Sequence, residues 1–111
     1  MLNYKAPLRD MRFVMNEVFD YPAHYRALGS GEDASPEVVD AILEAAATYC
    51  EEVLAPLYVS GGEEGCHFQA GEVTTPKGFP EAYKAYAAAG WTTLGAPEAY
   101  GGQGLPHVLN I

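Results

Sequence analysis

Basic residues and long apolar runs are both scarce in this sequence. Only 6 of the 111 residues are lysine or arginine, against 15 aspartates and glutamates, so the formal net charge is −9. A surface of this sign repels phosphate backbones, which makes nucleic acid a poor partner. No run approaches the roughly 20 apolar residues of a membrane-spanning helix, and the opening residues lack the apolar centre of a signal peptide. We therefore expect a cytoplasmic protein without a membrane span.

Cysteine is equally rare, which bears on disulfides and metals. Cys50 and Cys66 are too few for a disulfide framework, and two reduced thiols are expected in a cytoplasmic protein. Cys50 falls on the apolar side of a helical pattern, where a thiol behaves as a small hydrophobic group. Cys66 and His67 are adjacent, but neighbours rarely converge on one ion and no second ligand cluster exists. No metal site is predicted.

Phosphate-binding signatures are missing as well. Gly101, Gly102 and Gly104 lack the GxGxxG spacing and follow no strand, and the sequence has no GxxxxGK[ST] run. Taken alone, the YGGQG stretch predicts a tight turn, because glycine permits positive φ and the close approach of another backbone.

What the sequence does contain is 49% apolar residues, enough for the core of one small domain. Helical periodicity predicts three helices, over residues 7–20, 35–57 and 79–89. A further helix would begin near Leu105 with no stop signal, so we expect the chain to be the front part of something longer. The predicted fold is all-α: a small bundle of about three helices plus the start of a fourth, joined by glycine-rich connections.

The middle helix has the clearest signals at its ends. Ser35 is a good N-cap and Pro36 a good first residue. Pro56 should end or bend the helix, because it has no N–H to give to the preceding turn. The next segment, residues 60–80, is rich in glycine and cannot form a long helix, although a short hairpin around residues 69–71 is possible.

Two expectations concern the first third of the chain. Pro22 should end the first helix, and residues 29–31 should form a flexible connection. Residues 1–26 carry a net charge of +1 and the remainder −10, and Lys5, Arg9 and Arg12 share one helix face. We expect that face to be solvated; the alternative is that its cations meet an acidic neighbour.

A resemblance connects these segments. The run AGWTTLGAPEAYGGQGLP is similar to the segment near the end of the N-terminal domain of acyl-CoA dehydrogenases, which carry a GW/GL…PExYGGxGL stretch. The matching residues are Gly90, Trp91, Leu94, Pro97, Glu98, Tyr100, Gly101, Gly102, Gly104 and Leu105. The runs YKAPLRDMRFVMNEVFD and GEVTTPKGFPEAYKAYAAAGW resemble a branch with an N-terminal extension, which includes enzymes acting on 3-methylthiopropanoyl-CoA-type thioesters. The resemblance spans nearly the whole chain.

The resemblance implies a division of the chain and of the chemistry. Residues 1–30 would be the extension helix and linker, and residues 31–111 the N-terminal helical domain, truncated at its C-terminal side. The family removes the α-proton of an acyl-CoA with a carboxylate while hydride passes from the β-carbon to FAD. It places that base, and most flavin contacts, in later domains. The chain alone is therefore expected to hold no catalytic or cofactor-binding residue and to be inactive, with FAD present only in the full-length enzyme. Glu98, beside a proline, is expected to be a turn residue.

The same resemblance implies a supporting role for this part of the enzyme. It would contribute one wall of the acyl pocket and a packing face for the remaining domains of a homo-oligomer. The candidate pocket-adjacent residues are Tyr100, Gly101, Gly102, Gly104 and Leu105. Their alternative role is a tight turn that positions the next helix, and the alternative function is a free-standing helical interaction module without activity. Either way, an apolar face would await a partner.

Overall fold

The computed structural model describes residues 3–29 and 33–110. About 64% of the described residues are helical. The elements in chain order are α1 (Leu8–Arg12) continued by a π-helical segment (Phe13–Val18), α2 (Tyr21–Ala27), α3 (Pro36–Tyr49), a second π-helical segment (Cys50–Leu54), α4 (Ala55–Glu64), β1 (His67–Gln69), β2 (Glu72–Thr74), α5 (Phe79–Ala88), and three 3₁₀ turns (Trp91–Thr93, Glu98–Tyr100 and His107–Asn110). Apart from one small hairpin these are helices and turns, so the predicted all-α class is confirmed.

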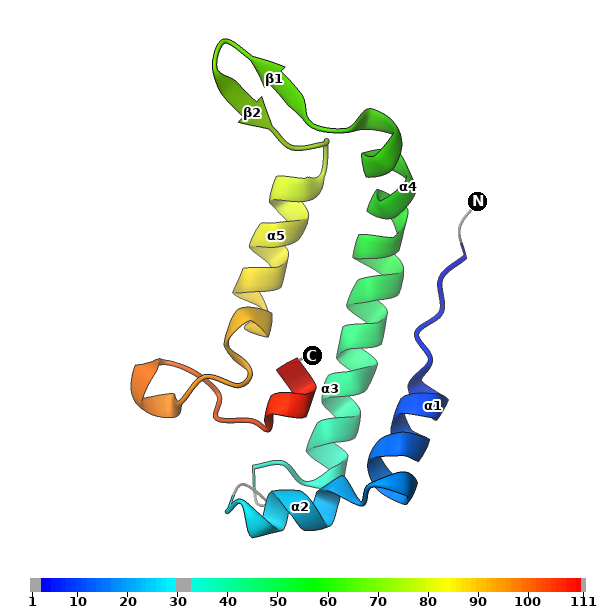
Figure 1. The fold of residues 1–111 in the computed structure, drawn as a ribbon, viewed down its shortest axis with the longest axis vertical. Helices are drawn as coiled ribbons and strands as arrows, with labels where there is room; N and C mark the ends of the chain where they lie inside the picture. The colour runs from blue at the N-terminus through cyan, green and yellow to red at the C-terminus, as the bar shows by residue number, and fades with distance from the viewer. Residues whose placement is uncertain (1–2, 30–32, 111) are drawn as a thin grey trace.

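One long helix forms the spine of the molecule (Figure 1). It runs without a break from α3 through the π-helical segment into α4. Ser35 caps its start as expected, because the side-chain oxygen accepts a hydrogen bond from the Val38 N–H at 3.3 Å. Among the described residues, no helix is both long enough and apolar enough to cross a membrane.

Pro56 was expected either to end this helix or to bend it, and the expectation that it ends the helix is wrong. Pro56 lies in the first turn of α4, and the helix continues to Glu64. The π-helical turn just before it is wider than an α-helical turn. We attribute the continuation to that turn, which gives room where a proline ring would otherwise clash with the carbonyl four residues earlier.

The helix α2 was not predicted. Pro22 was expected to end the preceding helix, yet it lies in the first turn of α2, where its missing N–H costs nothing. Asp20 caps this helix: its backbone is left-handed, with φ of 45°, and its side chain accepts from the Ala23 N–H. Of the predicted connection, Gly29 is described with a positive φ of 74°, and residues 30–32 lie outside the described residues.

The possible hairpin is confirmed. β1 and β2 pair antiparallel, with Phe68 opposite Val73. Ala70 and Gly71 connect them with φ angles of 54° and 82°, the two positive values that a tight two-residue hairpin turn requires.

The buried core is small and lies at one end of the spine. It consists of Met15, Tyr25, Ala34 and Val39, with Val108 and Leu109 of the last 3₁₀ turn packed against it. The chain end thus returns to the start of α3, as Figure 1 shows. The last segment, where a further helix was expected to begin, forms a 3₁₀ turn over His107–Asn110.

The molecule is open rather than compact. Its radius of gyration is 17.1 Å, whereas a compact domain of this length would have about 13 Å. Its accessible surface is 7983 Å², against about 6,000 Å² for a compact protein of this mass. Large apolar side chains such as Phe19, Tyr58 and Phe68 are exposed. Much of the apolar surface is thus available to a partner.

Candidate functional site

The segment with the family-like glycines folds into a loop that is closed on itself. It starts after α5, where Gly90 has φ of 86°, and it ends at Leu105. Three backbone N–H groups of its second half donate to carbonyls of its first half: Gln103 to Thr93 at 3.0 Å, Gly104 to Ala96 at 2.9 Å, and Leu105 to Leu94 at 2.9 Å. We call residues 90–105 the glycine loop.

Two glycines of this loop are required for different reasons. Gly101 has φ of 86°, a conformation that side-chain-bearing residues rarely adopt. Gly102 lies against the backbone of Ala96, so that an added Cβ would come within 1.9 Å of the Ala96 carbonyl oxygen. Gly104 also has a positive φ, of 64°. The tight turn predicted from the spacing of these glycines is confirmed.

The structure brings the candidate pocket residues together at the outer end of this turn. Tyr100 is 88% exposed, whereas Gly102 and Leu105 are half-buried. Leu94 is buried and Trp91 is half-buried. The amides of Gln103, Gly104 and Leu105 donate to carbonyls of the same loop. Tyr100, by contrast, projects into solvent.

Glu98 lies in the 3₁₀ turn that leads to Gly101, as expected for a turn residue. Its side chain is next to Gly104, where an added Cβ would be 3.4 Å from Glu98 Cγ. The residue is exposed.

A second surface feature is an apolar groove between the spine and α5, which we call the aromatic groove. Its volume is about 350 Å³. The lining residues are Tyr49, Leu54, Leu57, Tyr58, Phe79, Ala82, Tyr83 and Tyr86. The sequence pattern predicted the helix α5, but not that tyrosines of the spine would lie beside it, because nothing local shows which helices will face one another.

The floor of the aromatic groove is fixed by specific contacts. The Tyr49 hydroxyl donates to the Ala82 carbonyl at 2.6 Å, and the Tyr49 and Tyr86 rings lie 6.0 Å apart at 43°. Desolvation raises the pKa of the Tyr49 hydroxyl, with smaller contributions from Cys50 and Tyr86. The groove is therefore a preformed feature with a neutral, apolar lining.

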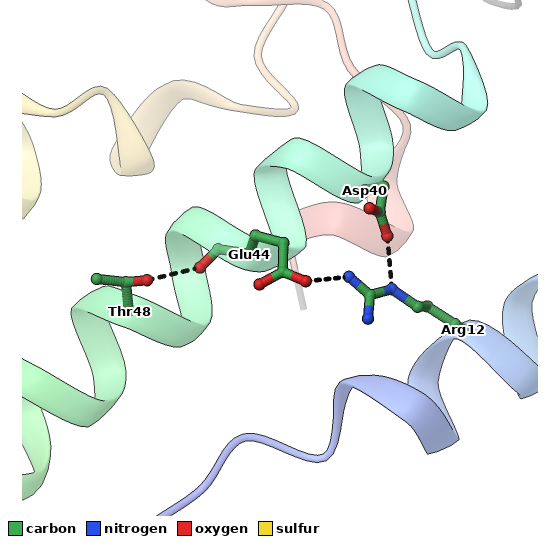
Figure 2. A network of polar contacts seen from close by, with 4 residues as sticks. All are labelled: Arg12, Asp40, Glu44 and Thr48. Carbon is green, nitrogen blue, oxygen red and sulfur yellow. Dashed lines mark hydrogen bonds and ion pairs between the residues drawn. The ribbon is translucent and has the colours of Figure 1, made fainter.

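The other side of the spine carries an ion-pair network (Figure 2). The Arg12 guanidinium donates to the carboxylates of Asp40 and Glu44, one turn apart on α3. The hydrogen bond to Glu44, then that to Asp40, raises the arginine pKa further. Thr48 extends the row of polar contacts by donating to the Glu44 carbonyl at 3.0 Å.

A second contact ties the first described residues to the spine. Lys5 forms an ion pair with Glu51 at 3.2 Å, and the Ala6 N–H donates to the same carboxylate at 2.9 Å. The Ala6 hydrogen bond, with a smaller contribution from Lys5, lowers the pKa of Glu51. The alternative, that the cations of this face meet acidic neighbours, is therefore confirmed for Lys5 and Arg12, although the Lys5 side chain remains 75% exposed. Arg9 is exposed and forms no ion pair with a described residue.

The cysteines and histidines do not assemble into a site. Both cysteines are free; Cys50 is half-buried and Cys66 is exposed. His67 pairs with Glu64 at 3.1 Å, and the pKa of Glu64 is lowered by the Lys77 backbone N–H and then by His67. Within residues 3–29 and 33–110, no three potential metal ligands gather at one place.

We next compared the sequence of this chain with those of known proteins. The chain is similar to the N-terminal part of a dehydrogenase. It is 33% identical over 108 residues to 3-methylmercaptopropionyl-CoA dehydrogenase of Ruegeria pomeroyi, a match that covers 97% of this chain and 18% of that protein. None of the models of protein families matches the chain. The resemblance found in the sequence is thus supported by a match that spans nearly the whole chain.

Proposed function

We propose that this chain is the N-terminal part of an FAD-dependent acyl-CoA dehydrogenase, which catalyses α,β-dehydrogenation of an acyl-CoA thioester. The observation that carries this proposal is the 33% identity, over 97% of the chain, to a dehydrogenase that acts on an acyl-CoA by its name. The chain spans only 18% of that relative. Its contribution is therefore structural support for chemistry performed elsewhere in the enzyme.

The open shape supports a packing role. The radius of gyration of 17.1 Å and the exposed apolar side chains describe a surface suited to contact with more polypeptide. We assign this contact to the remaining domains of the same enzyme and to a homo-oligomer in the cytoplasm. Residues 1–30 form the extension and its linker, and residues 31–111 form the N-terminal helical domain.

Within that domain we assign the end of the glycine loop to one wall of the acyl pocket. Tyr100 projects from the loop, and the backbone behind it is held by the hydrogen bonds of Gln103, Gly104 and Leu105. A side chain on such a rigid turn can be positioned against a ligand without a helix of its own. In this role Tyr100 and Leu105 contact the acyl group. Gly101, Gly102 and Gly104 form the turn that positions them.

The residues described here fit FAD poorly. The flavin cofactor carries a pyrophosphate, which requires cations or a set of unsatisfied N–H groups. The Arg12 guanidinium is occupied by two carboxylates, and the glycine-loop amides donate to its own carbonyls. We therefore assign no step of flavin chemistry to this chain, which alone would be inactive.

Purification of a longer product that begins with these residues tests the proposal. We expect bound flavin, seen by its visible absorbance after desalting, and reduction of that flavin by an acyl-CoA thioester. The 111-residue chain purified in parallel should carry no flavin. If the gene instead encodes a stop codon directly after Ile111, the free-standing interaction module is the better explanation.

A further inference from the structure

We draw no further inference here: the strongest candidate, the aromatic groove between the spine and α5, is an open apolar face, and nothing in the part of the chain that the structure describes shows what covers it.

Discussion

Two segments lie on opposite sides of the spine, and different forces hold them. The N-terminal arm, residues 3–19, contacts the spine through Lys5 and Arg12 and buries little apolar surface besides Met15. The C-terminal arm, residues 79–105, contacts it through close packing at Gly61 and through the Tyr49 hydroxyl. One arm is therefore sensitive to salt and pH, and the other to small changes of shape. The comparison shows that one helix can hold two segments of its own chain by different interactions, ion pairs on one side and close packing on the other.

The largest effect is expected inside the C-terminal arm. In Gly102→Ala the new Cβ would collide with the Ala96 backbone, at 1.9 Å from its carbonyl oxygen. Because backbone must move, we expect a cost of about 3 kcal/mol and faster hydrogen exchange at the amides of Gln103, Gly104 and Leu105. Gly101→Ala is the control: nothing lies within 4 Å of its added Cβ, so only its positive φ should cost about 1 kcal/mol. Equal exchange in the two variants would show that the close approach is not needed.

A smaller effect is expected where the C-terminal arm contacts the spine. Gly61→Ala places a Cβ 2.6 Å from the Phe79 ring, whereas Gly62→Ala meets nothing within 4 Å. Both changes raise helix propensity by up to about 1 kcal/mol, so the difference between them isolates the contact with Phe79. We expect Gly61→Ala to be less stable than Gly62→Ala by about 1–2 kcal/mol in urea unfolding. A difference near zero would mean that Phe79 moves aside at no cost.

The N-terminal arm should respond to salt instead. Arg12→Gln removes the ion pairs to Asp40 and Glu44, which are solvent-exposed and therefore weak. We expect a several-fold increase in amide exchange of α1 at low ionic strength, and roughly none at 1 M salt, where the unmodified arm is equally weakened. Arg9→Gln is the control, at an arginine of the same helix that forms no ion pair within residues 3–29 and 33–110. An identical response from both variants would refute the role of the network.

The smallest effect should appear on acidification. The pKa of Glu51 is lowered from its ordinary value of 4.5, so its stabilising contribution is present above that pH and is lost as pH falls through the lower, folded value. The chemical shift of the Ala6 N–H, which donates to Glu51, should report this step. Glu51→Gln should abolish it. A titration midpoint at or above 4.5 would contradict the assignment.

Sequence patterns predicted elements whose signals are local. Ser35, the helical periodicity of residues 79–89 and the possible turn at residues 69–71 each marked an element that the structure contains. The glycine loop was predicted as a turn for the same reason, since both positive φ and close approach follow from glycine itself. Its contact with an acyl group stays a prediction.

The features that were missed depend on partners distant in the sequence or on an ambiguous residue. Arg12 and Asp40 are 28 positions apart, so helical periodicity could not show that they meet. Proline can end one helix or begin the next, and Pro22 was assigned the wrong one of these roles. The aromatic groove was missed because its two walls come from helices whose mutual orientation only the tertiary structure defines.

The π-helical segment before Pro56 has a consequence for how this chain can change in length. In a regular α-helix, positions eight apart differ by about 80° around the axis. One additional residue in a wide turn shifts this angle back by about 100°, which leaves a difference of only about 20°. Leu57 thereby comes back to the side of Tyr49, and both line the aromatic groove. We expect that loss of a single amino acid here would leave the helix intact but rotate α4 by about 100° relative to α3, so that Leu57 no longer lies on the side of Tyr49. The π-helical segment thus fixes the rotation of α4 relative to α3. We therefore expect insertions and deletions to be tolerated at the hairpin tip but not in the spine.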